Sequence, residues 1–512
     1  MIRQKTEGTS TVDETTMRKA YRATDVLAAV AEELKEGRAD RLLHKAAAGL
    51  AVICTEELAA RCGNVYGRRV ALLVGTGNNG ADALLAGVRL RRRGVVVDAL
   101  LVGDRAYEPG LGELTRLGGY VLAAGDSDSA KSALSRADLV VDGIIGESGT
   151  GGLYGYAAEL AAAIPPSTPV IAVDIPSGVE PDTGEIHGPH IKADITVTFA
   201  AWKAATFLPP ASYAAGRLRF VSVGLPPIPA EPIVRCLGDR GIAERWPVPT
   251  TTSHKYLRGV LGVVAGSDTY PGAAVLAVIG AKQAGAGIIR YIGPPRVTGH
   301  VLTKVPEAVP GFGQVQAWLL GSGVEDDAEQ DRAIDTALNS GLPCVVDAGA
   351  LEACVRRRMA GERSAPADRI LLTPHAGELA RILGWLGHDV RRDEVEARPA
   401  YFGLEVARAV DATVLVKGAT TLITRPDGMI ASQAEAPPWL ATAGAGDVLA
   451  GIAGALMSGG VDAFDAGEMA AFIHGRAAAE AHRSRGGGPI TASSVAHVAP
   501  NVIGAALAAR EG

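Results

Sequence analysis

The chain has 512 residues, a length that excludes a single hydrophobic core and predicts two to four domains. Hydrophobic residues make up 47% and charged residues 21%, which excludes a disordered chain and is typical of an ordinary soluble globular protein. The net charge of −6, without a basic stripe interleaved with aromatic residues, gives no reason to expect nucleic acid as a partner, and no apolar run is long enough to span a membrane.

Strands and helices alternate along the first half of the chain. The predicted helices cover 23–35, 39–62, 81–93, 109–117 and 129–136, and the predicted strands cover 69–74, 95–102, 119–123, 138–145, 170–173, 194–199 and 217–223. Alternation of this kind predicts a mostly parallel sheet with helices on both faces.

Prolines become dense between residues 225 and 250, in the stretches 226–232 and 247–249. Neither a helix nor a sheet interior continues through proline at this density. We therefore predict a boundary here, between a first domain of residues 17–235 and a second of residues 236–512.

The alternation then resumes without repeating the first half. The predicted strands cover 259–265, 287–292, 315–320, 343–347, 369–372, 412–416, 420–424 and 429–433, and the predicted helices cover 272–285, 327–339, 350–358, 376–383, 399–410, 447–457, 463–482 and 493–509. The sequence predicts two different α/β domains fused in one chain.

The five cysteines are scattered and contain no Cys-x-x-Cys pair. They are Cys54, Cys62, Cys236, Cys344 and Cys354. This spacing predicts free thiols in a reducing cytoplasm rather than a disulfide framework or a zinc site.

The first glycine loop, residues 75–80, has the sequence Gly-Thr-Gly-Asn-Asn-Gly. It matches the Gly-x-Gly-x-x-Gly pattern of nicotinamide-cofactor sites, and Asp98 lies near the spacing of a ribose-binding acid. However, Asp98 falls inside a predicted strand, and the oxygens of Asn78, Asn79 and Asp82 better suit a hard cation or sugar hydroxyls. An asparagine-rich turn in left-handed conformation, without a ligand, is a further alternative.

Two other predicted strands end in oxygen-bearing side chains. Asp142 precedes the glycine-rich loop 146–152, and Asp174 and Ser177 follow the strand 170–173. Ligands bind outside the carboxyl ends of parallel strands, so we expect these loops and loop 75–82 to converge.

These motifs resemble those of the NAD(P)H-hydrate epimerases, which interconvert the R and S hydrates of NADH and NADPH and use a bound potassium ion. They read Gly-x-Gly-Asn-Asn-Gly-x-Asp, Val-Asp-Gly-Ile-Ile-Gly and Val-Asp-Ile-Pro-Ser-Gly, within residues 20–225. The resemblance implies a Rossmann-like doubly wound domain, K⁺ ligands at Asn79, Asp142 and Ser177, and Asp174 as the acid/base. It also implies substrate contacts from Asn78, Asn79, Gly80, Ala81, Asp82, Gly146, Glu147, Ser148, Gly149, Thr150, Gly151, Gly152 and Asp174.

The chain departs from this family at three positions. Ala81 and Ala83 replace glycines, and Glu147 adds negative charge where a phosphate-bearing substrate would lie. A non-catalytic binding domain is therefore an alternative for the first half.

In the second half, the turn 443–447 reads Ala-Gly-Ala-Gly-Asp and precedes an apolar helical pattern. The N–H groups at the start of a helix lack intrahelical partners and lie at the positive end of the helix dipole, so they suit a phosphate. Asp447 is placed to act as a base on a hydroxyl beside that phosphate. The alternative is a simple helix cap.

Four further turns support a ligand site. Residues 417–421 could hold a nucleotide or form a hairpin with an exposed lysine, and the turn 373–378 places His375 at the carboxyl end of a strand. Small residues also fill the turns 270–274 and 321–323. The P-loop pattern is absent.

In this order the motifs resemble the ribokinase-like superfamily and, within it, the ADP- or ATP-dependent NAD(P)H-hydrate dehydratases, over residues 250–509. The resemblance implies a ribokinase-like α/β domain with Asp447 as the base and ADP or ATP, with Mg²⁺, as co-substrate. It implies hydrate contacts from Ala273, Gly323, His375 and Asp447, and nucleotide contacts from Lys417, Gly418, Ala419, Thr420, Thr421 and Gly446. Glu325 and Gly349 depart from the family pattern.

Together the resemblances imply a bifunctional repair enzyme. The first domain would epimerise the hydrates NADHX and NADPHX, and the second would phosphorylate the hydroxyl of the S hydrate and eliminate phosphate. We expect a homo-oligomer. The nearest alternative is a ribokinase-type kinase acting on a small alcohol, with a non-catalytic first domain, and hydride transfer ranks last.

Overall fold

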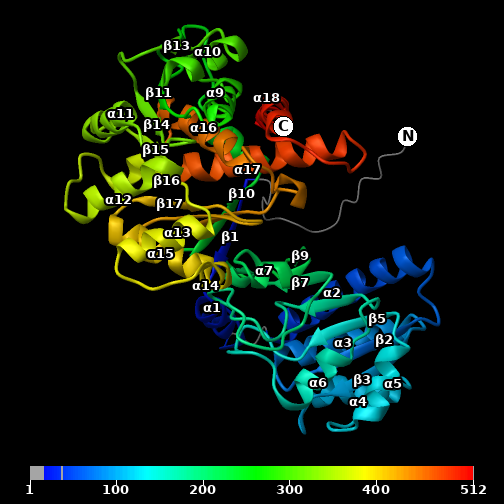
Figure 1. The fold of residues 1–512 in the computed structure, drawn as a ribbon. Coiled ribbons are helices and arrows are strands. Elements are labelled where there is room, and N and C mark those ends of the chain that lie inside the picture. Colours follow the sequence, from blue (N-terminus) through cyan, green and yellow to red (C-terminus); the bar gives the residue numbers. More distant parts are fainter. Residues whose placement is uncertain (1–15, 36–38, 511–512) are drawn as a thin grey trace. The chain divides into compact units, whose positions relative to one another are not determined.

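The computed structural model describes residues 16–35 and 39–510 and divides them into two compact units (Figure 1). Unit 1 contains residues 19–233, and unit 2 contains residues 234–510 together with residues 16–18. Both units are α/β, which confirms the predicted class. Within the described ranges, every helix is too short or too polar to cross a bilayer.

Unit 1 is built on a parallel seven-stranded sheet in the order β4-β3-β2-β5-β6-β7-β9. Its strands are β2 (Arg69–Val74), β3 (Val96–Leu101), β4 (Tyr120–Leu122), β5 (Leu139–Gly143), β6 (Val170–Val173), β7 (Ile195–Phe199) and β9 (Arg217–Val221). From β2 the chain moves outward to β3 and β4, and then returns to β5 on the other side. The point of reversal, between β2 and β5, is where open parallel sheets bind ligands.

Helices cover both faces of this sheet, each over its own apolar core. The helices of unit 1 are α1 (Ala23–Lys35), α2 (Ala39–Cys62), α3 (Asn78–Arg92), α4 (Glu108–Arg116), α5 (Ser127–Ser135), α6 (Gly155–Ala163) and the short α7 (Ala211–Ala215). Residues of α2, α3 and α4 contribute to one core, and residues of α5 and α6 to the other. The strands β1 (Met17–Tyr21) and β8 (Trp202–Lys203) form a short parallel pair, in which Ala20 lies opposite Trp202.

Unit 2 is also built on a mostly parallel sheet, but its strands follow a different order. Its strands run in the order β13-β12-β11-β14-β15-β16-β17-β18-β19-β10, and the chain reverses direction between β11 and β14. The strands are β10 (Val234–Leu237), β11 (Val260–Val264), β12 (Ile288–Ile292), β13 (Val309–Pro310), β14 (Ala317–Leu320), β15 (Cys344–Val346), β16 (Ile370–Leu372), β17 (Thr413–Val416), β18 (Thr421–Thr424) and β19 (Ile430–Gln433). Neighbours are parallel, except that β18 is antiparallel to both β17 and β19.

The helices of unit 2 also form two layers, with α11 to α15 on one side of the sheet and α16 and α17 on the other (Figure 1). They are α8 (Asp239–Arg245), α9 (Pro271–Gln283), α10 (Pro295–Lys304), α11 (Ala328–Asn339), α12 (Leu351–Met359), α13 (Ala376–Trp385), α14 (Arg392–Ala397), α15 (Pro399–Val410), α16 (Ala445–Ser458), α17 (Ala463–Arg483) and α18 (Ala492–Ala508). Helix α16 is buried along almost its whole length, between α9 and the sheet.

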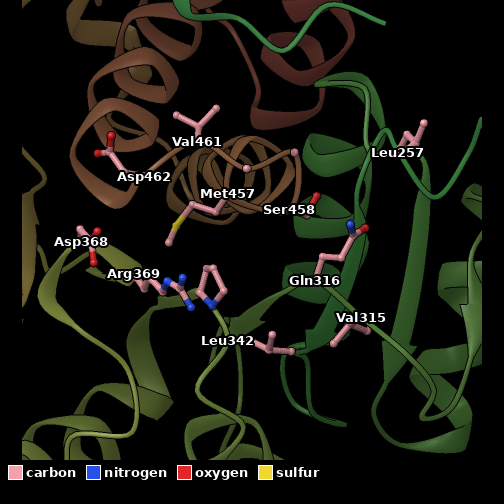
Figure 2. A pocket seen from close by; sticks show the side chains of 13 residues that line it. Leu257, Val315, Gln316, Leu342, Asp368, Arg369, Met457, Ser458, Val461 and Asp462 are labelled. Atoms are coloured by element: carbon pink, nitrogen blue, oxygen red, sulfur yellow. The ribbon is translucent and has the colours of Figure 1, made fainter. Parts of the chain in front are cut away.

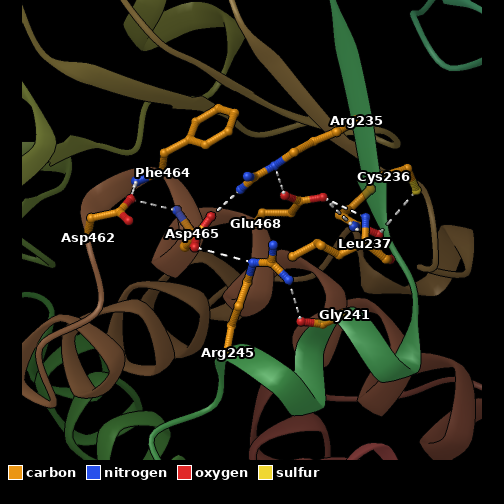
Figure 3. A network of polar contacts seen from close by, with 10 residues as sticks. Arg235, Cys236, Leu237, Gly241, Arg245, Asp462, Phe464, Asp465 and Glu468 are labelled. Atoms are coloured by element: carbon orange, nitrogen blue, oxygen red, sulfur yellow. Dashed lines mark hydrogen bonds and ion pairs between the residues drawn. The ribbon is translucent and has the colours of Figure 1, made fainter. Parts of the chain in front are cut away.

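The proline-rich stretch 225–250 contains two elements that the sequence did not predict, β10 and α8. They occupy the interval between the two groups of prolines, so proline enters neither element. A buried polar network fixes β10 against α17 (Figure 3). Arg235 donates to Glu468 at 2.7 Å and pairs with Asp465, and the N–H of Leu237 donates to Glu468 at 2.7 Å. Glu468 is fully buried, and these donors satisfy its carboxylate.

Candidate functional site

Helix α3 begins earlier than predicted, because Asn78 and Asn79 are helical. Two glycines permit the tight approach: a Cβ at Gly75 would lie 1.7 Å from the carbonyl oxygen of Ile144, and one at Gly80 would lie 2.0 Å from that of Gly75. Neither asparagine has a positive φ, so the left-handed asparagine turn is wrong. Asn79 donates from its amide to the carbonyl of Val173 at 2.5 Å, which joins the helix start to the end of β6.

The three strand-end loops of unit 1 converge, as predicted. Ser177, after β6, donates to Asp142 at the end of β5, with 2.6 Å between the hydroxyl and Oδ1, and its N–H lies 2.9 Å from Oδ2. The same hydroxyl contacts both the N–H and the carbonyl of Ile145, at 3.0 and 2.9 Å. A Cβ at Gly146 would lie 2.5 Å from the amide of Asn79, so the loop 146–152 starts against α3.

Asp174 occupies a strained position, with φ at +72°. Such a conformation is rare outside glycine and often marks a functional residue. Its Oδ1 accepts from the hydroxyl of Thr198 at 3.0 Å and from the ammonium of Lys203. Lys203 also lies 3.6 Å from Glu147 Oε2, so the extra acid is part of a buried ion network.

Asp82 completes this cluster, on the second turn of α3. Its Oδ1 is buried and accepts no hydrogen bond from the described residues. Burial, reinforced by the charge of Asp174, raises the pKa of Asp82 well above its ordinary range. A protonated carboxyl with an open oxygen is suited to bind an amide or a hydroxyl of a ligand.

Asp98 does not belong to this site. It lies in the middle of β3, opposite Tyr120, and forms an ion pair with Arg69 at 3.6 Å. A ribose-binding acid should stand at the end of its strand. The position of Asp98 therefore removes the support for a dehydrogenase-type cofactor site.

The turn before α16 forms the corresponding site in unit 2. Gly444 caps the helix with φ at +85°, and the helix starts at Ala445, so Asp447 lies in its first turn rather than before it. The N–H groups of Gly446 and Asp447 have no carbonyl four residues earlier within the helix. A Cβ at Gly446 would lie 3.4 Å from Lys417 Nζ, which places the ammonium directly over the turn.

Lys417 connects this turn to the ends of β15 and β16. Its Nζ lies 2.9 Å from Asp347 Oδ1 and 3.7 Å from Glu378 Oε2. Burial lowers the pKa of Lys417, but Asp347 and Glu378 more than offset this, so the pKa lies above its ordinary value. The loop 417–421 is the β17–β18 hairpin, as the simpler alternative had it. Its lysine, however, is only 20% exposed and is paired with Asp347.

Asp447 lies in an acidic, partly buried environment. Burial and the charge of Asp347 raise its pKa to about 7, while Lys417 and a hydrogen bond with Ser322 act in the opposite direction. Ser322 also donates to Asp347 at 3.0 Å. A carboxylate with a pKa near neutrality is matched to the work of a general base.

The remaining predicted residues border the same turn. Gly323, with φ at +68°, lies against Ala273, because a Cβ there would be 2.5 Å from the Ala273 methyl group. His375 caps α13: its Nδ1 accepts from the N–H of Glu378 at 3.1 Å, while its side chain is 56% exposed. Two residues of unit 2 depart from the family pattern, and of these Glu325 is exposed. Gly349 has no room for an acidic side chain, because an added Cβ would lie 2.5 Å from the carbonyl oxygen of Val324.

Lys203 and Thr198 were missed by the sequence prediction. Lys203 is the only charged residue in the stretch 195–208. This was the available signal, because a charge that is buried with its apolar neighbours requires a partner. Thr198 had no signal, since threonine is common in strands.

A cavity of about 520 Å³ lies at the opposite edge of the unit 2 sheet (Figure 2). It is lined by the amino ends of β15 and β16 and by the carboxyl end of α16, including Met457 and Ser458. Helix α16 has 14 residues and is therefore about 21 Å long. This cavity is separate from the site around Asp447, which begins the same helix.

In comparisons with known proteins, each half of the chain matches a family model. The family model described as NAD(P)H-hydrate dehydratase matches residues 261–501, and the model described as YjeF-related protein N-terminus matches residues 39–205. A relative from Mycobacterium tuberculosis, named bifunctional NAD(P)H-hydrate repair enzyme Nnr, is 40% identical over 453 residues, which is 87% of this chain and 90% of the relative. A relative of the same name from Mycobacterium leprae is 39% identical and covers 89% and 93%.

Among solved structures, the ADP/ATP-dependent NAD(P)H-hydrate dehydratase from Bacillus subtilis, co-crystallised with ATP and Mg²⁺, is 26% identical. It covers 52% of this chain and 97% of its own, with a TM-score of 0.48.

Two doubly wound domains, one with an acidic residue in the first turn of a buried helix at the strand ends, define a two-domain α/β enzyme. The matches over nearly the whole chain make the family specific. The chain belongs to the bifunctional NAD(P)H-hydrate repair enzymes, which confirms the family that the motifs indicated.

Proposed function

We propose that this chain repairs hydrated NADH and NADPH, with residues 17–235 as the epimerase domain and residues 236–512 as the dehydratase domain. The observation that carries the proposal is the position of Asp447, in the first turn of α16 beside Gly446 and under Lys417. The carboxylate of Asp447, the N–H groups at the start of α16 and the partly buried ammonium of Lys417 surround one point. A phosphoryl group and the hydroxyl that receives it fit there together.

The dehydration would proceed in two steps. Asp447 takes the proton from the hydroxyl of the S hydrate, and the hydroxyl oxygen attacks the terminal phosphoryl group of ADP or ATP, held by Gly446 and the hairpin 417–421. Phosphate then leaves the ring carbon in place of hydroxide, which is the poorer leaving group, and the reduced nicotinamide ring is restored. Ala273, Gly323 and His375 border the same turn and would contact the hydrate.

Mg²⁺ bound with the nucleotide would neutralise the charge of the transferring group. Glu378 Oε1 is suited to receive the ion or its water, because its nearest basic atom, His375 Nε2, is 3.7 Å away. Mg²⁺ commonly relies on one or two carboxylates together with phosphate oxygens.

In the first domain, Asp142, Ser177 and Asn79 would hold a potassium ion. The described residues contain no cluster of three or more His, Cys, Asp or Glu suited to a metal, so the ligands would be one carboxylate with amide, hydroxyl and carbonyl oxygens. Asp142 fits this role, because it is fully buried and accepts hydrogen bonds from the neutral donors of Ser177 and Ile144. Burial raises the pKa of Asp142 to about 6, and a bound cation would favour its ionised form.

Asp174 would act as the acid/base of epimerisation, and the helix start 78–82 and the loop 146–152 would contact the hydrate. The strained backbone of Asp174 and the open oxygen of Asp82 support this assignment. All five cysteines are free, which fits the proposed cytoplasmic location. Assembly as a homo-oligomer remains a prediction.

The purified chain should restore the reduced-nicotinamide absorbance of hydrated NADH when ADP and Mg²⁺ are added. A ribokinase-type kinase would instead accumulate a phosphorylated alcohol without that absorbance. Supplying the R hydrate alone at short times tests the first domain. No turnover of the R hydrate under these conditions would make the first domain a binding module.

A further inference from the structure

Lys203 links two acids that come from different loops of unit 1. Its ammonium donates to Asp174 Oδ1 and to the carbonyl of Phe199, the latter at 2.9 Å, and it lies 3.6 Å from Glu147 Oε2. Its side chain is only 2% exposed. The three groups lie in a row: Lys203 is hydrogen-bonded to the strained Asp174 on one side and ion-paired with Glu147 on the other.

The environment of Glu147 suits it to exchange protons. The charged groups that act on it are Lys203, Asp174 and Asp182. Burial raises its pKa to about 7, Lys203 lowers it, and Asp174 and Asp182 raise it further. Glu147 thus changes between its acid and carboxylate forms near neutral pH, whereas Lys203 stays charged because its pKa lies above the ordinary value.

We propose that Lys203 and Glu147 form a proton relay that resets Asp174 during epimerisation. The inference rests on the epimerase activity proposed above. In the relay both residues act through Asp174 rather than on the reacting atoms of the hydrate, so they are positioning residues. Their arrangement also gives Glu147, which the family pattern lacks, a function in this chain.

The relay conserves protons and charge. Asp174 removes a proton from the hydrate, so an O–H bond breaks in the substrate and forms on the carboxylate. Asp174 then passes this proton to Lys203 while Lys203 passes one of its own to Glu147. Asp174 is again a carboxylate, Lys203 is again an ammonium, and Glu147 holds the proton. The reverse transfer delivers the proton to the product.

The decisive test compares Lys203→Arg with Lys203→Met in the full-length protein. Arginine keeps the positive charge and the donors but does not release a proton in proteins. The relay predicts that both variants lose about 10²-fold or more in kcat for the R hydrate, with KM unchanged. Near wild-type kcat in Lys203→Arg would show that only the charge matters and would overturn the relay.

Glu147→Gln provides a second, milder variant in case the arginine does not fit. In the wild type, kcat for epimerisation should rise as the pH increases through about 7, because Glu147 accepts a proton only when it is ionised. The glutamine variant should lose this step and remain slow across the range. A pH profile identical to that of the wild type would contradict the relay.

Two controls separate the relay from a structural effect. Glu57→Gln removes another buried acid of unit 1, one paired with Arg61 and Arg217, and should leave the pH profile unchanged. Dehydration of the S hydrate measures whether each variant is still folded in unit 2. A wild-type protein inactive on the R hydrate would refute the epimerase activity itself, whereas an active Lys203→Arg protein refutes the relay alone.

Discussion

Asp447 shows how a few neighbours change the protonation of an acid in the first turn of a helix. An acid in the first turn of a helix is normally stabilised in its charged form by the helix dipole. Here burial and Asp347 raise its pKa to about 7, with Lys417 acting in the opposite direction. The sequence identified Asp447 from its turn, but Asp347 and Lys417 come from strands far apart in the chain, and only the fold brings them together.

Asp447→Asn should abolish dehydration and leave epimerisation intact. Asparagine has a similar shape but cannot accept the hydroxyl proton, so kcat should fall by about 10²- to 10⁴-fold. The assay follows reduced-nicotinamide absorbance with the S hydrate and ADP, and R-to-S conversion in the same variant serves as the control. Loss of both activities would mean that the domains do not act independently.

The dehydratase rate should depend on pH through Asp447. A base works only when it is ionised, so kcat should be highest above about pH 7 and should fall about tenfold per pH unit well below it. A pH–rate profile with saturating ADP and S hydrate measures this. A histidine or a shifted acid titrates between about pH 5 and 8. A flat profile over this range would contradict the assignment of Asp447 as the base.

Asp174→Asn should give the opposite result to Asp447→Asn. Asparagine keeps contact with Thr198 but removes the acid/base, so epimerisation should fall by about 10²-fold or more while S-hydrate dehydration continues. The measurement is conversion of the pure R hydrate, with the S hydrate as control. Normal turnover of the R hydrate would refute the role of Asp174.

Helix α16 positions the turn 443–447 because it packs very closely on α9. A Cβ at Gly451 would lie 2.2 Å from the carbonyl of Ala277 and 2.8 Å from the N–H nitrogen of Ala281. Both contacts are with backbone atoms, which cannot rotate away. The glycine therefore sets the distance between the two helices, and with it the position of Asp447, which lies four residues, or about one helical turn, earlier in α16.

Gly451→Ala should lower the free energy of unfolding by about 1–3 kcal/mol, as expected for overpacking of a core. The matched control is Gly299→Ala, inside α10, where an added Cβ meets nothing within 4 Å. That substitution should be neutral or stabilise by up to about 1 kcal/mol, because alanine favours helix. Urea denaturation measures both, and equal effects would show that close packing on α9 is not the cause.

Element boundaries were predicted well where the pattern was periodic. Helices α1, α2 and α15 and strands β2 and β6 lie where the apolar spacing put them. The misses have physical causes: α6 is rich in alanine and has no clear apolar stripe, and β10 forms through Arg235 and Glu468, a tertiary contact that a linear pattern cannot show. Likewise, helix α3 starts early because Gly75 and Gly80 allow backbone contact.

At the scale of the whole molecule, the family was predictable because its motifs are short and local. The candidate sites were only partly predictable, since a charge such as Lys203 acquires its role from Asp174 and Glu147 after folding. The three departures that raised doubt about the first domain also take their places only in the fold. Ala81 and Ala83 lie buried in α3, and Glu147 forms an ion pair with Lys203.

Nucleotide should stabilise unit 2 through Lys417. Saturating ADP with Mg²⁺, at about 100 times its Kd, should add about 2.7 kcal/mol to the stability of the unit that binds it. Calorimetry should show this as a raised unfolding temperature in the wild type and equally in Asp174→Asn. Lys417→Met should remove the shift, and an undiminished shift in that variant would place the nucleotide elsewhere.

The most direct test of the central claim follows phosphorus by NMR while the S hydrate is consumed with ADP. If Asp447 activates the hydroxyl for phosphorylation and elimination, AMP, inorganic phosphate and NADH should appear in equal amounts, and Asp447→Asn should produce none of them. A phosphorylated hydrate that persists, or NADH formed without AMP, would contradict the account.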